Sequence, residues 1–389
     1  MKTDVAIVGA GPAGLLLGHL LRAAGIDAAI VERQSAAHVL SRIRAGVLET
    51  TTTDLMRQLG LDHRLNSEGL RHEGFHLSDG ARSIRIDIAA LTGRHVTVYG
   101  QTELTRDLMD AAPKRGLEIL YEAADAALHD IETSAPRLTF RRDGAAARLE
   151  SRVIVGCDGF HGVCRRAIPA GAGRTFEKVY PFGWLGILAD VPPCDHELIY
   201  ANHTNGFALA SMRSGTRSRY YIQIPSGTRL EDWPDDRIWD ELAVRLGPDV
   251  ASRITRGAAI EKSIAPLRSF VFEPMRHGSL FLAGDAAHIV PPTGAKGLNL
   301  AASDVTYLAD ALVDFFRHGR EAFLKAYSDR ALARIWKSER FSWALTRLMH
   351  NFPEDGDFDQ RIRIAELDYI ANSIAAQTTI AENYAGLSL

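Results

Sequence analysis

Apolar residues recur in two different patterns at the start of the chain, and together they predict a strand, a helix and a second strand. Residues 5–8 and 28–31 are short apolar runs, as in buried strands. Between them, residues 12–24 carry leucines at helical spacing, and Gly25 follows as a helix stop. A strand, a helix and a strand within about 30 residues form the βαβ unit of a parallel sheet.

Further apolar runs predict more buried strands later in the chain. Residues 152–155 and 279–282 are strongly apolar, and each leads within a few residues into a glycine and an aspartate. Between them, residues 183–225 alternate aromatic and polar side chains, most clearly at residues 219–224. This alternation is typical of antiparallel strands with one exposed face, so we expect a second sheet inserted between pieces of the first.

Helical periodicity dominates the C-terminal part, at residues 303–327 and 331–348. The predicted fold class is therefore α/β, or α+β over the whole chain. It combines a Rossmann-like dinucleotide-binding domain with a parallel sheet, an inserted and mainly antiparallel sheet, and a helical C-terminal region.

Composition and charge exclude several classes of protein. The chain has 389 residues, 46% hydrophobic and 24% charged, which are ordinary values for a globular protein. A net charge of −3 without a long basic run argues against nucleic-acid binding. Residues 5–21 are apolar but interrupted by glycines and a proline, so we expect no membrane span. Three cysteines suit neither a disulfide framework nor a metal site; without a signal peptide, we expect a cytoplasmic location and no metal.

The first strand and helix are joined by a G-x-G-x-x-G motif made of Gly9, Gly11 and Gly14. Such glycines allow a tight turn, close approach of a pyrophosphate and close helix–strand packing. Glu32 closes the second strand, where a carboxylate can accept hydrogen bonds from a ribose. The motif predicts a dinucleotide site without saying which dinucleotide binds.

Two later segments make the prediction more specific: residues 156–159 (GCDG) and 284–288 (GDAAH) each follow a predicted strand. Together with the N-terminal glycine motif, they make the chain similar to the FAD-dependent aromatic hydroxylases. The resemblance extends over essentially the whole chain. Its longer matching stretches are residues 42–49, 98–103, 179–184, 196–203, 289–299 and 379–384.

The resemblance implies an FAD enzyme that uses NAD(P)H and O₂ through a flavin hydroperoxide. The implied substrate is 4-hydroxybenzoate, an aromatic acid with its phenol opposite its carboxylate, and the product is 3,4-dihydroxybenzoate. One alternative is the same chemistry on another aromatic acid, such as 3-hydroxybenzoate or 3,4-dihydroxybenzoate. The others are a flavin reductase and a non-catalytic flavin-binding protein.

The resemblance also implies roles for individual residues around the substrate. The substrate-binding residues would be Tyr200, Ser211, Met212, Arg213, Tyr221 and Pro292. The catalytic residues would be Tyr200, Tyr384, His72, Pro292 and Arg219. Arg213 would hold the carboxylate, and Tyr200, Tyr384 and His72 would carry the phenolic proton to solvent. From the residue types alone, ordinary packing roles remain the alternative.

The cofactor residues follow from the resemblance in the same way. FAD would contact Gly9, Gly11, Gly14, Glu32, Arg42, Arg44, Val47, Gln101, Asp158, Asp285, Leu298 and Asn299. The reduced nicotinamide would contact Arg33, Gln34, His38, His161, Arg165 and Arg268. Because Arg33 could meet a 2′-phosphate, we expect NADPH, with NADH as the alternative.

The domain boundaries and the assembly are expected from the resemblance too. The FAD-binding domain would comprise residues 1–72, 97–179 and 268–320; the substrate-binding sheet domain 73–96 and 180–267; the helical region 321–389. A homodimer is usual in this family. Ala13, His38 and Met212 depart from the family pattern of serine, tyrosine and a polar residue, which leaves nicotinamide preference and substrate range open.

Overall fold

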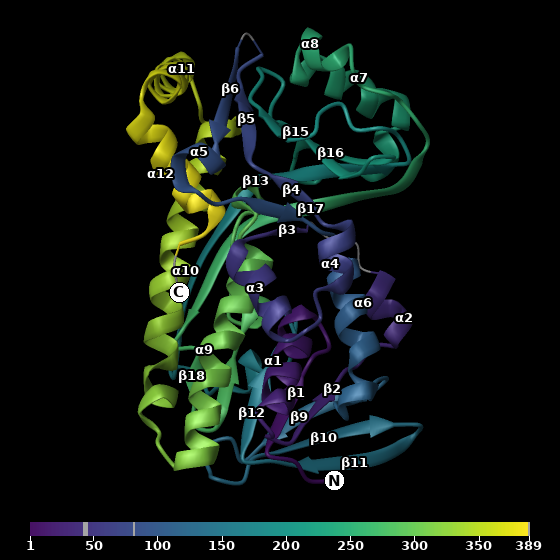
Figure 1. Cartoon of the computed structure of the whole chain (residues 1–389), viewed down its shortest axis with the longest axis vertical. Coiled ribbons are helices and arrows are strands. Elements are labelled where there is room, and N and C mark those ends of the chain that lie inside the picture. The colour runs from purple at the N-terminus through teal and green to yellow at the C-terminus, as the bar shows by residue number, and fades with distance from the viewer. Residues whose placement is uncertain (42–45, 81, 388–389) are drawn as a thin grey trace.

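The computed structural model describes residues 1–41, 46–80 and 82–387 of the chain. The molecule is elongated, with a parallel sheet in its lower half and a large, mainly antiparallel sheet in its upper half (Figure 1). Arg42 and Arg44, both predicted to contact FAD, lie outside the described residues.

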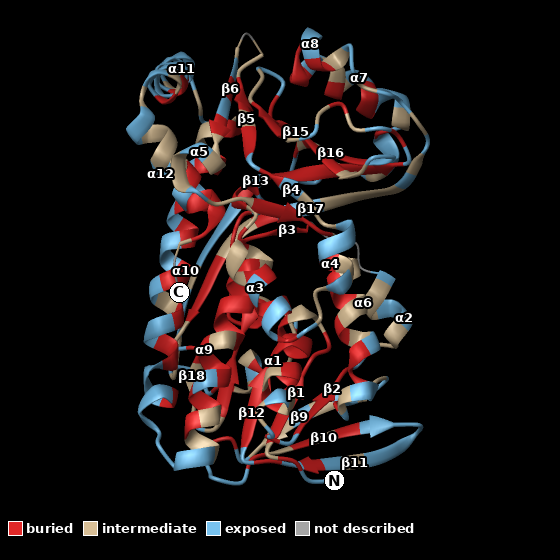
Figure 2. Cartoon of the chain, in the orientation of Figure 1, coloured by how far each residue is buried: buried red, intermediate tan, exposed pale blue. Residues whose placement is uncertain are grey.

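The lower half is built on a six-stranded sheet whose central strands are parallel. Across the sheet the strands are β18 (Arg276–His277), β19 (Leu280–Leu282), β12 (Val153–Gly156), β1 (Val5–Val8), β2 (Ala28–Val31) and β8 (Glu118–Leu120). The strands predicted at 152–155 and 279–282 are therefore present, each beginning one residue later. Every residue of β1, β2, β12 and β19 is buried (Figure 2), which explains why these strands are continuous apolar runs.

Helices pack around this sheet. α1 (Pro12–Ala23) contacts both α6 (Gln101–Ala111) and α9 (Gly297–His318). Shorter helices complete this half: α2 (Ala36–Ser41), α3 (Thr50–Gln58) and α4 (His63–Glu68). A separate antiparallel sheet at the lower edge consists of β9 (Ala124–His129), β10 (Arg137–Arg142) and β11 (Ala145–Glu150).

The upper half contains an eight-stranded sheet in which only β14 and β5 run parallel. Across the sheet the strands are β20 (His288–Ile289), β17 (Ala259–Glu273), β13 (Arg174–Ala189), β16 (Arg217–Pro225), β15 (Ala208–Ser214), β14 (Leu198–Ala201), β5 (Gly74–Ser78) and β6 (Ser83–Asp87). α7 (Asp235–Leu246) and α8 (Pro248–Ala251) cover one face, and α5 (Ile88–Thr92) follows β6.

The two halves are joined by long strands and by a small sheet. β13 and β17 are paired along both halves, and their register shifts between Val179 and Gly183. The predicted domain boundaries at 179–180 and 267–268 fall near this irregularity. Between the halves, β7 (Val96–Val98) pairs with β3 (Val47–Leu48) and β4 (Leu70–His72).

The C-terminal region is helical, with one correction to the predicted boundaries. A helix was predicted over residues 303–327, but α9 ends at His318 because Gly319 adopts φ +68°, and α10 (Ala322–Met349) begins three residues later. α11 (Asp357–Asn372) and α12 (Ile374–Ala385) follow. They lie beside the upper sheet, so these two helices belong to the upper half of the molecule (Figure 1).

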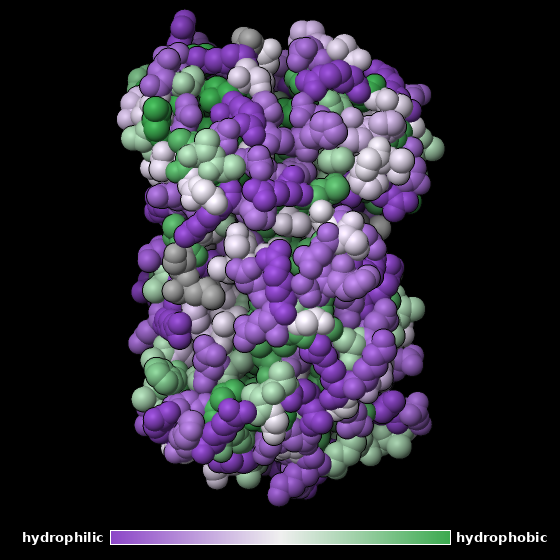
Figure 3. All heavy atoms as spheres, viewed as in Figure 1, coloured by the Kyte–Doolittle hydropathy of each residue, from purple (hydrophilic) through white to green (hydrophobic). Residues whose placement is uncertain are grey.

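The face seen in Figure 3 is mainly hydrophilic, with apolar side chains scattered over it. No helix in the described ranges is both long enough and apolar enough to cross a membrane. Within the same residues, no group of His, Cys, Asp and Glu side chains is arranged to hold a metal ion.

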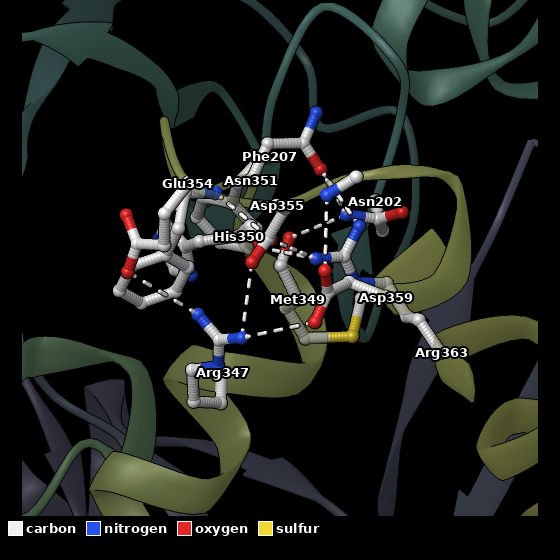
Figure 4. Close-up of polar contacts among 12 residues, drawn as sticks. Asn202, Phe207, Arg347, Met349, His350, Asn351, Glu354, Asp355, Asp359 and Arg363 are labelled. Carbon is white, nitrogen blue, oxygen red and sulfur yellow. Dashed lines mark hydrogen bonds and ion pairs between the residues drawn. The ribbon is translucent and has the colours of Figure 1, made fainter. Parts of the chain in front are cut away.

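A polar network ties the end of α10 to the upper sheet (Figure 4). The Asn351 side-chain amide donates to the carbonyls of His203 and Thr204, at 2.7 and 3.0 Å. Its oxygen accepts from Asn202 at 3.1 Å and from Arg363 at 3.0 Å. The connection between α10 and α11 is therefore fixed against the loop between β14 and β15.

Candidate active site

The turn between β1 and α1 leaves space for a dinucleotide. Gly9 has φ +105°, and a Cβ there would meet the Cys157 carbonyl, so only glycine fits. A Cβ at Gly11 would meet nothing within 4 Å, which leaves room beside the start of α1. No side chain caps this helix start, so its free N–H groups are available to a pyrophosphate.

Glu32 organises this turn from the end of β2. One carboxylate oxygen accepts from the backbone N–H of Ala10 and the other from that of Gln34, both at 2.8 Å. The sequence predicted a contact with a ribose at this position. The structure adds that Glu32 also holds the glycine turn in place, while each oxygen keeps a second lone pair.

A cavity of about 420 Å³ lies beside the glycine turn. Its lining includes five of the predicted cofactor or nicotinamide residues: Gly9, Glu32, Arg33, Gln34 and Asp158. The Asp158 carboxylate accepts from the Cys164 N–H at 2.9 Å, and burial raises its pKa. Its Oδ1 has no hydrogen-bond partner among the described residues, so it is available to a ligand. The glycine turn, the cavity and this oxygen fit the adenosine and pyrophosphate of FAD.

The loop carrying Asp285 lies at the carboxyl end of β19, which neighbours β12 and its Asp158 loop. Parallel strands bring their carboxyl ends to one edge of a sheet, where ligands of such folds bind. Asp285 is half-buried, between the buried residues Gly284 and Ala286. It can therefore meet a ligand along this edge. Gln101, at the start of α6, is also half-buried.

The loop at residues 292–299 opens α9, whose start also has no side-chain cap. The sequence predicted that Asn299 would contact FAD, but its side chain is fully used within the protein. Its oxygen accepts from Glu49 N–H at 2.9 Å and Thr52 hydroxyl at 2.8 Å. Its amide donates to the Val47 and Ala295 carbonyls, both at 2.9 Å. Only the backbone of Asn299 remains for FAD, together with the half-buried Leu298 and buried Val47.

A buried ion network below this loop was not foreseen from the sequence. Lys296 Nζ lies 2.6 Å from Glu49 Oε1 and donates to the Tyr384 carbonyl at 2.8 Å. Arg334 binds the other oxygen of Glu49 at 2.9 Å. These residues lie 247 or more positions from Glu49 along the chain, so no local pattern could reveal the group.

Tyr200 on β14 and Tyr384 on α12 meet in the core of the upper half. Their hydroxyl oxygens are 2.8 Å apart, although 184 residues separate them in sequence. Phe75 stacks on Tyr384 and lies edge-on to Tyr200. Burial raises the pKa of Tyr200 well above its ordinary value and that of Tyr384 to about 12. Both phenols are therefore neutral at pH 7 and can pass a proton along one hydrogen bond.

His72 on β4 is buried, and no direct hydrogen bond joins it to the tyrosine pair. Both of its ring nitrogens lack a hydrogen-bond partner among the described residues. Burial lowers its pKa, so the ring is neutral and can accept a proton. Of the predicted proton relay, the described residues therefore show a direct hydrogen bond between the two tyrosines but none to His72.

The predicted carboxylate-binding residues lie in the upper sheet. Leu209 pairs with both Tyr200 and Tyr221, and Ser211 pairs with Arg219, so these residues share one face of the sheet. The strand register shifts between Met212 and Ser214, and Arg213 lies at this irregularity. The Nη1 of Arg213 is buried and has no hydrogen-bond partner within the described ranges. Burial lowers its pKa, and Tyr221 lies beside it. The guanidinium of Arg213, which lies beside Tyr221 and keeps Nη1 without a partner in this part of the chain, can bind a carboxylate.

Arg219 is already engaged: it binds Glu261 at 3.0 Å and Ser263 at 3.1 Å and lies over the Tyr221 ring. The structure corrects the predicted role of the Met212 side chain in substrate binding. Met212 pairs with Ser218, on the opposite face from Ser211, because successive strand residues point to opposite sides. Its side chain therefore does not join the predicted substrate site. Pro292 is exposed at the start of a 3₁₀ turn.

The predicted nicotinamide residues form two groups. Arg165 and Arg268 lie over the Phe160 ring at 4.8 and 4.5 Å, and the exposed His161 packs edge-on against it. Arg268 also binds Glu177 at 3.0 Å. Arg33 and Gln34 line the cavity beside the glycine turn, whereas His38 lies on the exposed face of α2. No described contact joins His38 to the other five.

Comparison with known proteins agrees with this geometry. Residues 2–342 match the family model described as "FAD binding domain". In fold, the chain is similar to the p-nitrophenol 4-monooxygenase of Pseudomonas putida DLL-E4, with a TM-score of 0.84, 17% identity and full coverage of both chains. The predicted α/β architecture and the predicted FAD cofactor are confirmed.

Sequence relatives are more specific. The chain is 57% identical to a p-hydroxybenzoate hydroxylase of Acinetobacter baylyi, over 100% of this chain and 96% of that protein. It is 28% identical to a 3-amino-4-hydroxybenzoate 2-monooxygenase of Streptomyces cremeus, over 93% of this chain and 92% of that protein. The chain therefore belongs to the FAD-dependent aromatic hydroxylases and is an FAD-dependent monooxygenase that hydroxylates an aromatic acid.

Proposed function

We propose that this enzyme converts 4-hydroxybenzoate, O₂ and NADPH with one proton into 3,4-dihydroxybenzoate, water and NADP⁺. Bound FAD supplies the redox chemistry, taking a hydride from the nicotinamide and activating O₂. One oxygen atom enters the ring beside the phenol and the other leaves as water. The protein's residues hold the acid and remove its phenolic proton.

A single observation carries this proposal: Tyr200, hydrogen-bonded to Tyr384, shares a sheet face with Tyr221, and Tyr221 lies beside Arg213, whose buried Nη1 has no partner among the described residues. A substrate bound here needs an anionic group for Arg213 and a hydroxyl for Tyr200. An aromatic acid with opposed carboxylate and phenol has both. The name of the relative at 57% identity supports the same substrate.

In this proposal, Arg213 and Ser211 bind the carboxylate, and Tyr221 lies beside it. Tyr200 accepts a hydrogen bond from the phenolic hydroxyl of the substrate, and Tyr384 extends the path of the proton. Neutral His72 receives the proton when solvent bridges the remaining gap. Loss of the proton raises the electron density of the ring, which favours attack on activated oxygen. Arg219 keeps Tyr221 in place.

FAD is proposed to lie along the carboxyl edge of the lower sheet, from Glu32 past Asp158 to Asp285, with its ring near the 292–299 loop. Gln101, Val47 and Leu298 would border it, and Arg42 and Arg44 remain predictions. The domain division expected from the sequence assigns FAD to the lower half and the acid to the upper sheet.

The direct test is NADPH oxidation by the purified protein with and without 4-hydroxybenzoate, together with chromatography of the product. We expect substrate-stimulated oxidation and one 3,4-dihydroxybenzoate per NADPH. Stimulation that yields only hydrogen peroxide would reject this substrate. Absence of stimulation with NADPH and NADH would reject the proposed reaction altogether.

We propose NADPH over NADH because Arg33 is exposed, and an exposed guanidinium can meet a 2′-phosphate. Phe160 with its two arginines offers a surface for the rest of the nicotinamide cofactor. Comparing kcat/KM for both nucleotides in wild type and Arg33→Ala tests this. We expect the preference for NADPH to shrink in the variant, and an unchanged ratio would contradict it.

We also infer a homodimer, formed through α11. Phe358, Ile362 and Tyr369 are exposed to 76, 55 and 59% and fall on one stripe of this helix, since a turn takes about 3.6 residues. Figure 3 shows pale and green atoms among hydrophilic ones at this corner of the molecule. A second copy would cover the stripe, as exposed apolar patches often mark interfaces.

Light scattering after gel filtration tests the dimer. We expect twice the chain mass of 42.6 kDa for the wild type and a shift towards monomer for Ile362→Glu with Tyr369→Glu. Ile364, exposed on another side of α11, gives the control variant Ile364→Glu. A monomeric wild type, or a dimer unaffected by the double change, would contradict this interface.

For the location, we propose the cytoplasm, because Cys157, Cys164 and Cys194 are buried free thiols, as is usual in a reducing compartment. Fractionation of the source cells with detection of the protein would test this. Recovery with an oxidising compartment would contradict it.

A further inference from the structure

A buried ion pair lies behind the loop that presents Asp285. Asp304 on α9 and His288 on β20 are each 1% exposed, and His288 Nε2 lies 2.6 Å from Asp304 Oδ2. The same oxygen accepts the Gly284 N–H at 2.9 Å. One carboxylate oxygen therefore holds both ends of the five-residue loop 284–288.

Asp285 lies between these two anchor points. Gly284 has φ +62°, a conformation that favours glycine, and Ala286 and Ala287 are buried. The loop backbone thus has little freedom while both anchors hold. The direction in which the half-buried Asp285 faces is set by Asp304 and His288, neither of which is exposed to a ligand.

The charges around His288 come from three elements. Burial lowers its pKa, but the carboxylates of Asp304 on α9, Asp285 in the loop and Glu339 on α10 together raise it above the ordinary value. Burial raises the pKa of Glu339 itself to about 7. His288 Nδ1, Asp304 Oδ1 and Glu339 Oε1 lack hydrogen-bond partners in the described part of the chain.

We propose that the His288–Asp304 pair is a positioning device that sets the affinity for FAD by fixing the loop that carries Asp285. The inference rests on the proposed placement of FAD beside Asp285. While His288 is charged, Asp304 is a paired carboxylate and the loop is rigid. When His288 loses its proton, a buried carboxylate faces a neutral ring, which is costly, and the loop relaxes.

The test measures the dissociation constant of FAD for the full-length apoprotein, by fluorescence, between pH 6 and pH 9. In the wild type we expect weaker binding as the pH rises above the pKa of His288. His288→Gln should remove this pH dependence, and Asp304→Asn should raise the dissociation constant about tenfold or more. Glu339→Gln should move the weakening to lower pH, because it removes one carboxylate that favours charged His288.

A matched control is Asp314→Asn, on the same helix but paired with the exposed Arg320. It should leave FAD binding within about twofold of wild type. Circular dichroism of each apoprotein shows whether it folds. If Asp304→Asn does not fold, the proposal is tested by whether Glu339→Gln moves the weakening of FAD binding to lower pH. Identical pH profiles in wild type, His288→Gln and Glu339→Gln would overturn the proposal.

Asp285→Asn separates this inference from the placement of FAD. If Asp285→Asn weakens FAD binding while folded Asp304→Asn and His288→Gln do not, the pair has no positioning role and the FAD placement stands. If Asp285→Asn leaves FAD binding unchanged, the placement fails and the inference fails with it.

Discussion

The Tyr200 hydroxyl is the atom through which the phenolic proton would leave the substrate. It is buried and bonded to Tyr384 at 2.8 Å. General acid–base groups contribute about 100-fold or more to a rate. We therefore expect Tyr200→Phe to bind FAD normally but to slow hydroxylation about 100-fold, measured in a single turnover of the reduced enzyme with O₂.

Tyr220 provides a matched control, because it is buried in the same sheet, on β16, but on the other face from Tyr200. Tyr220→Phe should retain the hydroxylation rate. A Tyr200→Phe enzyme that hydroxylates as fast as wild type would remove Tyr200 from the proton path.

Arg213 is predicted to act on binding and not on the chemical step. Its Nη1 has no partner in the described part of the protein, and a hydrogen bond between charged groups contributes roughly 1.5–3 kcal/mol. Since about 1.4 kcal/mol is a factor of ten, Arg213→Gln should raise KM for 4-hydroxybenzoate about 10- to 100-fold, with a smaller effect on kcat. Steady-state kinetics with saturating NADPH measure both.

The nearby Arg217 is exposed and pairs with Asp190 on the protein surface. Arg217→Gln should leave KM unchanged. An equal rise of KM in both variants would indicate a general effect of positive charge near the site, contrary to a specific role of Arg213.

At the scale of elements, the end of α10 depends on the neutral form of His350. Its Nδ1–H donates to the Thr346 carbonyl at 3.0 Å, and its Nε2 accepts from the Trp184 N–H at 2.7 Å. Burial lowers the pKa of His350 to about 3. A protonated ring cannot accept from Trp184, so the helix end loses this bond in acid.

The lowered pKa of His350 fixes the sign of its effect on stability. The contribution of neutral His350 to the free energy of unfolding is complete above pH 6.5, the pKa of histidine in the unfolded chain, and is lost as the pH falls towards 3. Over this whole pH range the contribution is on the order of 5 kcal/mol. Denaturant unfolding at pH 7.5 and 5 measures it. Relative to wild type, His350→Gln should be less stable at pH 7.5 and should lose less stability on acidification. Parallel pH profiles would contradict this account.

At the scale of the whole molecule, Asn351 joins the C-terminal helices to the upper sheet (Figure 4). Asn351→Ala would leave the His203 and Thr204 carbonyls without this donor. We expect a loss of about 2 kcal/mol in the free energy of unfolding, since several hydrogen bonds are lost and each contributes roughly 0.5–1.5 kcal/mol.

Denaturant titration with fluorescence detection measures this loss. Asn372, exposed at the end of α11 and bonded only within that helix, supplies the control. Asn372→Ala should change the unfolding free energy by less than about 0.5 kcal/mol. Equal effects of the two substitutions would contradict a special role for Asn351.

Local patterns in the sequence determined the elements and the cofactor class. The apolar runs of β1, β2, β12 and β19 predicted a buried parallel sheet, because such strands have no polar face. The glycine motif predicted a dinucleotide turn, since only glycine tolerates the backbone of Gly9. The resemblance of long residue strings, and not periodicity, identified the FAD-dependent hydroxylases.

Tertiary structure alone decided how distant residues meet. Tyr200 and Tyr384, or Glu49, Lys296 and Arg334, become neighbours through sheet order and helix packing, which depend on the sum of many weak contacts and leave no local signal. Strand register also turns the Met212 side chain away from the face of the predicted substrate site. The Asn299 side chain makes its hydrogen bonds within the protein instead of with a ligand. Sequence specified what can bind; the packed fold specified which side chains remain free to bind it.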